Sequence, residues 1–396
     1  MDETEIVVIG AGAAGLSLVH HLTADGAAPA VILVDAPEGP LRPPERTWCF
    51  WEAGDGDYEE AVVASWPRLR VLGPDGTALV RRPDPLRYKM IRSSGFEAFV
   101  GRALAARPTV RRVCAEVDTV RNVPGGAEVG GVTAEGRRMT LRARWVYDSR
   151  PPRSLPPARS TLLQHFRGWF VRTGRPVFDP GVASLMDFRT PQPARGLSFG
   201  YVLPLGPDEA LVEYTEFSPA PLGDDAYERA LRHYTGEVLK LGALRVRAVE
   251  QGVIPMTDAV FPRRVGDAVF RIGTAGGATR PATGYTFAAI QRQSRAIADA
   301  YRRGAEPVPP PPYPARSRAM DAVLLRALDR GRVDGAAFFT GLFARTPPER
   351  LLRFLDGRSR PWEDIAIGLN TPVWPMLRTA AELPLLPRRR PSRERP

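Results

Sequence analysis

The fold is decided by a short stretch near the N-terminus, Ile6-Val-Val-Ile-Gly10-Ala-Gly12-Ala-Ala-Gly15. Its first four residues form a continuous apolar run, which is typical of a buried parallel strand. The glycine-rich segment follows at once, and residues 16–22 then predict a helix. A second apolar run at 30–34 ends at Asp35 and predicts the next strand. The first 35 residues therefore predict a complete β-α-β unit.

The glycine spacing is that of a loop that binds a dinucleotide. The first glycine allows a tight turn, the second lets a pyrophosphate approach the backbone, and the third lets the helix pack closely on the sheet. The helix N-terminus supplies free N–H groups and a positive dipole end for the phosphates. Asp35 is placed to accept the ribose hydroxyls, and its charge argues against a 2′-phosphate. The expected contacts of the loop are Gly10, Gly12, Ala13, Ala14 and Gly15.

Beyond residue 110 the patterns are mostly strand-like as far as about residue 260, and after that they become mostly helix-like. Apolar and polar residues alternate between 160 and 260, which predicts an antiparallel sheet, with one helix inserted at 224–241. A strand and a helix at 283–303 follow, and a proline run at 307–314 leads to a helical tail. We therefore expect an α/β fold in which a Rossmann-type domain is interleaved with an antiparallel-sheet domain. The expected regions are the first part of the nucleotide-binding domain at 1–155, a substrate domain at 156–262, a return segment at 263–305 and a helical C-terminal region at 306–396.

The composition excludes several classes of protein. The chain has 396 residues, of which 43% are hydrophobic and 25% are charged, as in ordinary globular proteins. Cys49 and Cys114 are too few for a disulfide framework, and the four histidines show no ligand spacing, so we expect no metal. The acidic N-terminus is unlike a secretory signal, and residues 365–377 are too short to span a bilayer. A cytoplasmic location is expected.

The basic charge has two interpretations. Lysines and arginines total 55 against 44 aspartates and glutamates, which gives a net charge of +11, and lysine occurs only at 89 and 240. This excess of arginine indicates coding bias first, and attraction to a nucleic acid or a membrane surface second. The sequence contains no nucleic-acid-binding motif, and its aromatic residues do not interleave with basic clusters. We therefore expect no nucleic-acid partner.

Three later segments indicate FAD rather than NAD. Arg92 at the start of a predicted helix, Asp148 after a predicted strand and the segment 271–277 resemble motifs of the aromatic-hydroxylase-like FAD proteins. In that family the arginine binds the phosphate and ribose region, and the glycine-rich motif holds the ribityl chain. Thr274 stands where most of these proteins have Asp, so ribityl binding should be weaker or rearranged. The cofactor contacts that the resemblance implies are Arg46, Arg92, Val117, Asp148, Gly273, Gly276 and Gly277.

Over most of its length the sequence resembles the bacterial lycopene β-cyclase family. In that family an acid protonates the terminal C1=C2 bond of an acyclic ψ end, the C5=C6 bond attacks the cation, and loss of the C6 proton leaves a β-ionone ring. The resemblance implies lycopene as substrate, γ-carotene and β-carotene as products, FAD in its reduced state, and NAD(P)H as reductant. It is carried by the order and spacing of segments at 46–51, 88–93, 201–205, 211–218, 252–256, 273–287, 338–343 and 351–356.

Glu213 is the expected acid. It lies in an otherwise apolar predicted strand and matches the strand glutamate of the family. An alkene is a very weak base, so the acid must stay protonated, and burial achieves this by raising the pKa of a carboxyl. The period of a strand puts Glu216 on the opposite face, where we expect it to meet solvent. The family often has a second acid directly after the first, but this chain has Tyr214 there.

Aromatic residues near the predicted cofactor site are candidate walls of a substrate pocket. Electron-rich aromatic faces can stabilise a ring cation and keep water away from it, although packing in the core is the commoner role of such residues. The residues expected to bind the polyene are Trp48, Phe50, Tyr285 and Phe287.

The helical tail combines apolar and basic residues, which favours a peripheral contact with the cytoplasmic membrane. A C40 hydrocarbon is nearly insoluble in water, so the enzyme must collect it from a bilayer. Packing of the same apolar residues onto the body is the alternative. The apolar set is Leu324, Leu325, Leu328, Phe338, Phe339, Leu342, Phe343, Leu351, Leu352 and Phe354. The basic set is Arg316, Arg318, Arg326, Arg330, Arg345, Arg350, Arg353 and 388–390.

Other functions stay open at this point. A flavin monooxygenase or halogenase, or a flavin-dependent cyclase of another isoprenoid, would use the same cofactor fold. The Trp-x-Trp-x-Ile-Pro string of flavin halogenases is absent. A monooxygenase adds oxygen to its product, whereas a cyclase gives an isomer of unchanged mass. A non-enzymatic, basic binding protein would carry no flavin.

Overall fold

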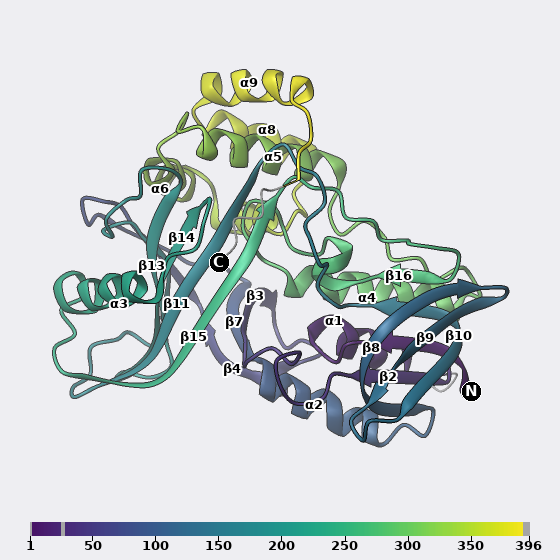
Figure 1. Cartoon of the computed structure of the whole chain (residues 1–396). Helices are drawn as coiled ribbons and strands as arrows, with labels where there is room; N and C mark the ends of the chain where they lie inside the picture. Colours follow the sequence, from purple (N-terminus) through teal and green to yellow (C-terminus); the bar gives the residue numbers. More distant parts are fainter. Residues whose placement is uncertain (1, 25–27, 391–396) are drawn as a thin grey trace.

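In the computed structural model, which describes residues 2–24 and 28–390, the chain forms a six-stranded, a seven-stranded and a three-stranded sheet (Figure 1). The six-stranded sheet lies at the lower right of the view, and the strands of the seven-stranded sheet stand to its left. Helices of the C-terminal region cover the top. The predicted α/β fold with two interleaved sheets and a helical tail is confirmed.

The six-stranded sheet contains the predicted β-α-β unit. Its strands are β1 (Asp2–Ile9), β2 (Val31–Asp35), β8 (Val110–Val123), β9 (Gly126–Thr133), β10 (Arg138–Asp148) and β16 (Val269–Arg271). β1 pairs in parallel with β2 and with β10, so its apolar residues 6–9 are buried on both faces. β9 pairs antiparallel with β8 and β10.

Three helices share a core with this sheet. They are α1 (Ala13–Leu22), α2 (Ser93–Ala105) and α4 (Phe287–Arg302). α1 and α4 pack against each other, which brings the two ends of the expected nucleotide-binding domain together. The helix predicted from residue 283 begins only at Phe287, because Gly284 has a φ of +72° and cannot belong to a right-handed helix.

The seven-stranded sheet has the order β15-β11-β14-β13-β12-β5-β6. Its strands are β5 (Arg68–Leu72), β6 (Ala78–Arg81), β11 (Thr161–Thr173), β12 (Val182–Asp187), β13 (Leu197–Pro204), β14 (Glu209–Ser218) and β15 (Leu244–Thr257). β5 pairs in parallel with β12, so residues 68–81 leave the region 1–155 and extend the second sheet. This pairing buries Leu69 and Val71 and covers an edge that would otherwise stay open.

One helix covers the outer face of the seven-stranded sheet. The helix predicted at 224–241 is α3 (Asp224–His233), followed by a π-helical turn, η2 (Tyr234–Val238). Its buried tyrosines, Tyr227 and Tyr234, share a small core with the outward-facing side chains of β11 and β14. The opposite face of the sheet is therefore the one that can contribute to a site in the middle of the molecule.

The three-stranded sheet separates the two main cores. Its strands are β3 (Thr47–Ala53), β4 (Val62–Trp66) and β7 (Leu86–Arg92), with a short 3₁₀ turn, η1 (Glu59–Ala61), before β4. Because side chains alternate along a strand, Trp48 and Phe50 pack into the core of the six-stranded sheet. Cys49 and Trp51 face the core of the seven-stranded sheet.

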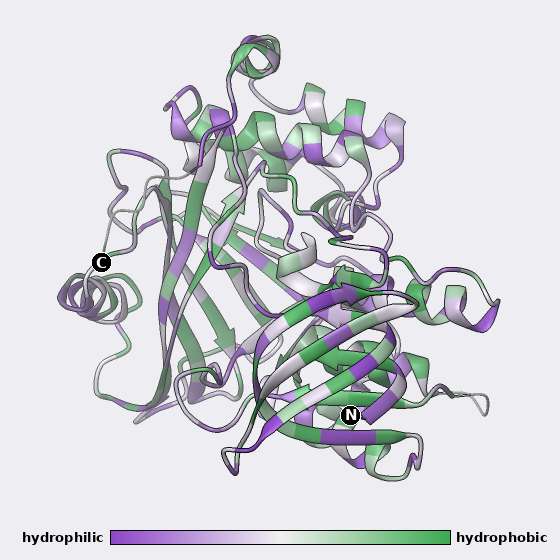
Figure 2. Ribbon diagram, turned by 45° about the vertical axis from the view of Figure 1, so that its right-hand side comes forward, coloured by the Kyte–Doolittle hydropathy of each residue, from purple (hydrophilic) through white to green (hydrophobic). Residues whose placement is uncertain are grey.

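The C-terminal region is helical, as expected, and its prolines mark the breaks. Its elements are α5 (Ala315–Asp329), α6 (Gly335–Arg345), α7 (Pro348–Leu355), α8 (Pro361–Leu369), α9 (Val373–Glu382) and the 3₁₀ turn η4 (Leu383–Leu385). Among the described residues, no helix has the length and the apolar character that a membrane crossing requires. Figure 2 shows hydrophobic and hydrophilic residues alternating along these helices.

The expectation that the apolar set of the tail faces a membrane is wrong. Eight of the ten side chains are buried in the core of the seven-stranded sheet, and Leu324 and Phe354 are partly buried against it. Helical spacing alone cannot distinguish a core-facing stripe from a lipid-facing one, and here α5 and α6 pack on that sheet. The exposed large apolar residues of the tail are instead Trp362, Ile365, Leu369, Val373, Trp374, Leu377 and Leu385.

Candidate active site

A cavity of about 480 Å³ lies where the three sheets and the tail meet. The loop after β1 forms one wall through residues 12–14, and β3 and β7 form another. The inner face of the seven-stranded sheet contributes Glu213 and Glu250. The loop 278–286 and the 3₁₀ turn η3 (Gly273–Gly276) close the side nearest α4. The helical tail supplies Phe339, Phe343 and Leu355.

The loop after β1 has the geometry that the glycine spacing predicts. Gly10 has a φ of +95°, a backbone conformation that favours glycine. A Cβ at Gly15 would overlap the carbonyl oxygen of Gly10, so only glycine permits this approach of helix to strand. Gly12 is the N-cap of α1 and has open space around it. The free N–H groups of the first helical turn therefore point to a space that a phosphate can occupy.

Two of the predicted cofactor residues are joined by an arginine. Arg150 donates to both carboxylate oxygens of Asp148, at 2.9 and 2.7 Å, and to the carbonyl of Val117 at 2.6 Å. Asp35 lies at the end of β2, where Arg112 and Arg42 approach its Oδ2 at 3.4 and 3.8 Å. These carboxylates are thus already paired with cations, and neither residue lines the cavity.

The predicted arginines have different positions. Arg46 lines the cavity and donates to the carbonyl of Gln251 at 2.9 Å. Arg92 does not line it, because its guanidinium contacts Glu45 and lies 4.2 Å from the ring centre of Phe170. The sequence pattern predicts that Arg92 begins a helix, which it does as the N-cap of α2, but not where its side chain points.

Hydroxyl groups surround the position where related proteins carry an aspartate. Thr274 Oγ1 is 3.2 Å from Thr279 Oγ1, which also accepts from Thr286 at 3.0 Å. In the same wall, Gln164 Oε1 and Thr283 Oγ1 are buried without a hydrogen-bond partner among the described residues. Buried polar atoms normally have partners, so these groups fit a polyhydroxylated ligand such as the ribityl chain of FAD.

The remaining glycines of the motif pack between two cavities. Gly273, with a φ of +62°, comes so close to Ala14 that a Cβ would lie 2.8 Å from the alanine methyl group. It lines the main cavity, whereas Gly276 and Gly277 line a second one of about 330 Å³. The motif therefore brings the turn after β16 against the turn after β1.

Glu213 projects from the middle of β14 into the main cavity. Only 8% of the residue is exposed, and no described group donates a hydrogen bond to its carboxylate. In register beside it lie Tyr201 on β13 and Gly168 on β11. Burial, and next the charge of Glu250, raise the pKa of Glu213 well above its usual value. This carboxyl can therefore stay protonated where an exposed glutamate is ionised.

The surroundings of Glu216 differ from those that the sequence predicts. The period of β14 puts it on the opposite face from Glu213, as predicted, but that face is covered by α3 rather than by solvent. Glu216 accepts a hydrogen bond from Tyr214 at 3.1 Å and lies 3.9 Å from His165 Nε2. Its place on the far side of the sheet separates it from the cavity.

A cluster of hydroxyls and a thiol, which the sequence patterns do not single out as a site, lies next to Glu213. The hydroxyl of Tyr88 is 2.6 Å from that of Tyr201 and 3.0 Å from that of Tyr285. Cys49 lies among them, and burial raises its pKa to about 12. Burial also raises the pKa of all three tyrosines, so the cluster is uncharged near neutral pH. Tyr88 and Tyr201 each begin one of the segments that carry the family resemblance, at 88–93 and 201–205, and this is the signal that could have found them.

The predicted aromatic wall is partly present. Trp48 lines the cavity and stacks on Phe287, with ring centres 5.8 Å apart and planes 17° apart. Tyr285 and Phe287 also line it. Phe50 does not line the cavity: it packs against Phe287 with ring centres 4.9 Å apart and is buried in the core. Cys49, which lies between Trp48 and Phe50 in the sequence, lines the cavity, as Phe50 was expected to do.

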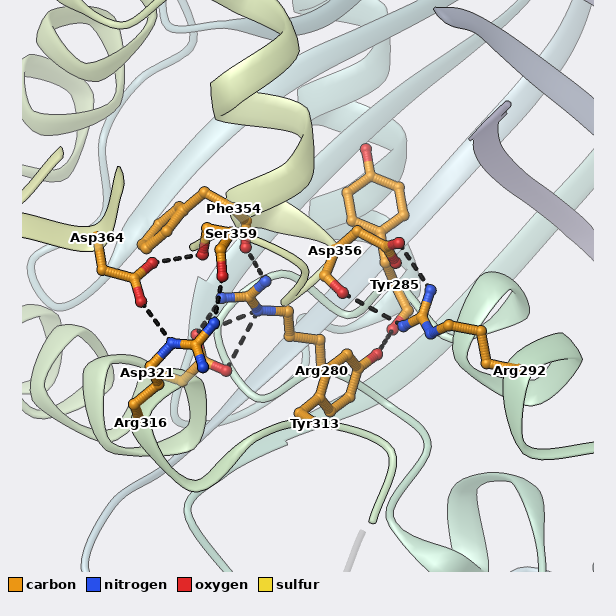
Figure 3. Close-up of polar contacts among 10 residues, drawn as sticks. All are labelled: Arg280, Tyr285, Arg292, Tyr313, Arg316, Asp321, Phe354, Asp356, Ser359 and Asp364. Atoms are coloured by element: carbon orange, nitrogen blue, oxygen red, sulfur yellow. Dashed lines mark hydrogen bonds and ion pairs between the residues drawn. The ribbon is translucent and has the colours of Figure 1, made fainter. Parts of the chain in front are cut away.

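A polar network fixes the loop that carries Tyr285 (Figure 3). Arg280 forms a buried ion pair with Asp321 of α5 and donates to the carbonyl of Phe354. The hydroxyl of Tyr313 donates to the carbonyl of Tyr285 at 3.2 Å. Two further pairs connect neighbouring helices: Arg292 of α4 bonds to Asp356 at the end of α7 at 2.7 Å, and Arg316 of α5 bonds to Asp364 of α8 at 2.8 Å. The cavity loop and the helical tail are therefore one connected structure.

Comparison with known protein families identifies the family of this chain. The model of a family described as "Lycopene cyclase protein" matches residues 5–381. The chain belongs to the lycopene cyclase family. The similarity inferred from the short segments is thereby confirmed over nearly the whole chain, including the strand with Glu213 and the helical tail. A search of curated proteins found no match to this lycopene cyclase family member.

Solved structures share the fold of this lycopene cyclase family member. A flavoprotein/dehydrogenase from Cytophaga hutchinsonii has a TM-score of 0.63 at 12% identity, with 97% of this chain and 99% of that chain covered. A p-nitrophenol 4-monooxygenase from Pseudomonas putida has a TM-score of 0.61 at 15% identity, covering 98% and 100%. A geranylgeranyl bacteriochlorophyll reductase-like protein from Thermoplasma acidophilum has a TM-score of 0.58 at 14% identity, covering 97% of each. At these identities the likeness shows the fold alone.

The site has no arrangement typical of a metal centre. Within residues 2–24 and 28–390, no group of three or more His, Cys, Asp or Glu side chains is placed to hold a metal ion. The groups that converge on the cavity are carboxyls, hydroxyls, amides and aromatic rings. This set suits proton transfer next to an apolar ligand.

Proposed function

We propose that this chain is a lycopene β-cyclase that converts the ψ ends of lycopene to β-ionone rings by acid–base chemistry without net oxidation. The observation that carries the proposal is the state of Glu213, a buried carboxyl that receives no hydrogen bond from the described residues and faces a largely apolar cavity. Such a carboxyl can hold its proton and deliver it to an alkene. Glu213 is the general acid in this proposal.

The cavity walls suit a cationic intermediate. Protonation at C2 of the ψ end leaves a tertiary cation at C1, which the C5=C6 bond attacks to close the ring. Water would trap this cation as an alcohol, so the site must be dry. The rings of Trp48, Phe287 and Tyr285 line the cavity, and aromatic faces both exclude water and stabilise a cation.

FAD is the proposed cofactor, with NAD(P)H as its reductant. The turn at 10–15, the N-terminus of α1 and the hydroxyls of Thr274 and Thr283 would hold it, and Asp35 and Asp148 lie at the ends of the strands on either side. Bound in its reduced, anionic form, FAD would supply a negative charge beside the ring cation. The residues of the chain then bind the polyene, exclude water and move the proton.

The test compares two substitutions on the same strand. The purified holoenzyme receives lycopene in liposomes and NADPH, once in air and once under anaerobic conditions, and product mass and absorption spectra are recorded. Glu213→Gln should abolish ring formation while FAD stays bound. Glu216→Gln, which changes a buried carboxyl on the opposite face of β14, should retain cyclisation. A product heavier by one oxygen, or full activity of Glu213→Gln, would overturn the proposal.

We also propose that the enzyme collects its substrate at a membrane through α8 and α9. Figure 1 places these helices at the top of the molecule. Trp362, Ile365 and Leu369 are exposed along α8, and Trp374 and Leu377 along α9. Arg350 lies over the ring of Trp362 at 4.9 Å, which combines the aromatic and basic groups typical of a membrane interface. This face replaces the buried apolar set as the proposed contact with the cytoplasmic membrane.

A further inference from the structure

Two glutamates face the cavity on either side of a single glycine. Gly168 of β11 is in register with Glu213 of β14 and, on its other edge, with Glu250 of β15. Residues opposite one another in neighbouring strands point to the same face of a sheet, so both carboxyls project from the same face, and both line the cavity. Two strand spacings separate their Cα atoms by about 10 Å.

The glycine leaves the space between the two carboxyls open. A Cβ at position 168 would lie 2.7 Å from Glu213 Cγ and 3.3 Å from Glu213 Oε1, so the glutamate side chain leans over the glycine toward β15. Any larger residue would stand between Glu213 and Glu250. The two acids therefore interact through the cavity rather than through an intervening side chain.

The two carboxyls have opposite environments. Glu250 accepts two hydrogen bonds from Thr47, one from its backbone N–H to Oε1 at 2.8 Å and one from its hydroxyl to Oε2 at 2.6 Å. Donors to both oxygens stabilise a carboxylate. Glu213 receives no such donor from the described residues. Two nearby titratable groups with environments this different separate into an acid and a charged partner.

We propose that Glu213 and Glu250 hold one proton between them, with the proton on Glu213 and the negative charge on Glu250. Glu250 is then a positioning residue, since its charge keeps the acid protonated. The effect of Glu250 on turnover rests on the proposed cyclase function. The sharing of one proton by Glu213 and Glu250 does not depend on that function. Sequence patterns missed Glu250 because it lies 37 residues after Glu213 and is brought to it only by the register of β11.

The other groups around the pair do not change this assignment. Cys49 faces it from β3, Tyr88 from β7, Tyr201 from β13 and Tyr285 from the loop before α4. Burial raises the pKa of each, so all four are neutral at the working pH. Among the described residues that line the cavity, Arg46 is the one cation, and its guanidinium bonds to the backbone of β15. Burial first, and then the charge of Glu250, raise the pKa of Glu213.

A single shared proton balances the reaction. Glu213 transfers its proton to C2 of the ψ end, and the new C1–C6 bond forms at the expense of the C5=C6 π bond. The proton that leaves C6 returns to the carboxyl pair, and the C5=C6 double bond is restored. The pair holds one proton before and after the turnover, and no electrons are gained or lost.

The test measures the proton directly and needs no substrate. Infrared difference spectra of the holoenzyme, titrated with pH, report protonated carboxyls by their C=O stretch. A wild-type band that Glu213→Gln removes assigns the signal to Glu213. In Glu250→Gln the midpoint of this band should move to lower pH by about one unit or more, because a nearby negative charge is lost. In Glu250→Asp, which keeps the charge, the midpoint should lie close to that of the wild type.

Activity provides the second readout. The alkaline limb of the pH–rate profile of Glu250→Gln should move in the same direction as the infrared midpoint, so that activity falls several-fold at high pH and less at low pH. FAD content and circular dichroism verify that the variant is folded. An unchanged or higher midpoint in Glu250→Gln, or no Glu213 band in the wild type, would overturn the proposal. Shifted midpoints in a protein that does not cyclise lycopene would leave the proton pair intact and remove the proposed function.

Discussion

The guanidinium of Arg280 lies 3.2 Å from the carboxylate of Asp321, and the two side chains are 1% and 3% exposed. Arg280 belongs to the loop that lines the cavity, and Asp321 belongs to α5. Burial raises the pKa of Asp321, and the adjacent guanidinium only partly opposes this effect. The ion pair is therefore costly to bury, and it connects the wall of the cavity to the helical tail.

Removing one member of this pair should destabilise the protein strongly. Asp321→Ala leaves the Arg280 charge buried without its partner, so the free energy of unfolding should fall by about 3–5 kcal/mol. Urea denaturation measures the change. As a control, Asp179→Ala breaks the exposed pair with Arg68, at 3.0 Å, and should cost less than about 1 kcal/mol. The double variant Arg280→Met/Asp321→Leu should lose less than Asp321→Ala, and equal losses for the buried and exposed pairs would contradict the prediction.

The stability of the folded protein should depend on the proton of Glu213. Its pKa is raised by folding, so above the ordinary glutamate pKa the native state binds more protons than the unfolded state. The free energy of unfolding then decreases as the pH rises toward the native pKa. Glu213→Gln should flatten this slope and make the inactive protein more stable than the wild type at neutral pH. Thermal unfolding at a series of pH values measures both effects, and Glu216→Gln is the matched comparison.

Acid should destabilise the protein through a different residue. Burial lowers the pKa of His165 to about 4, and its ring nitrogens bond to the hydroxyls of Tyr227 at 2.7 Å and Ser218 at 2.8 Å. Between the ordinary histidine pKa and about 4, the unfolded state binds the extra proton, so the free energy of unfolding falls as the pH is lowered, by at most about 3 kcal/mol for this residue. His165→Gln should reduce that slope, whereas His233→Gln on the exposed side of α3 should not. Equal slopes in the two variants would show that another group is responsible.

The face formed by α8 and α9 should determine binding to lipid. Trp374 is 76% exposed, so Trp374→Glu should reduce binding to vesicles that contain anionic lipid by at least about tenfold. Salt should weaken the remaining interaction, since arginines contribute to it. Val260→Ser, at an exposed apolar position outside the tail, should leave binding unchanged. Sedimentation with vesicles measures all three proteins, and equal binding of Trp374→Glu and the wild type would exclude this face.

Local patterns predicted the parts of the fold that depend on local sequence. The apolar run at 6–9, the glycine spacing and Asp35 predicted the first β-α-β unit, because a turn and a strand are short-range structures. Strand β5 could not be assigned to a sheet in this way, since its partner β12 lies more than 100 residues later, and β6 joins the same sheet only through β5. For the same reason the sequence could not link Glu250 to Glu213, because only the register of β11 brings the two residues together.

The direction in which individual side chains point could not be predicted from the sequence either. Arg92 begins α2 as its pattern predicts, yet its guanidinium turns away from the cavity toward Glu45. Trp48 and Phe50 share one face of β3, yet Trp48 lines the cavity and Phe50 does not, so the alternation along the strand could not decide which ring enters the wall. In the tail, the periodicity correctly predicted helices, but burial depends on which sheet they meet.

Phe339, Phe343 and Leu355 complete the cavity from the last fifth of the chain, whereas the two glutamates come from strands in its middle. Separate parts of the sequence therefore supply these apolar walls of the cavity and its two carboxyls. Under the proposed function, substitutions in α6 and α7 would change which end group fits the cavity and would leave the proposed proton donor, Glu213, in place.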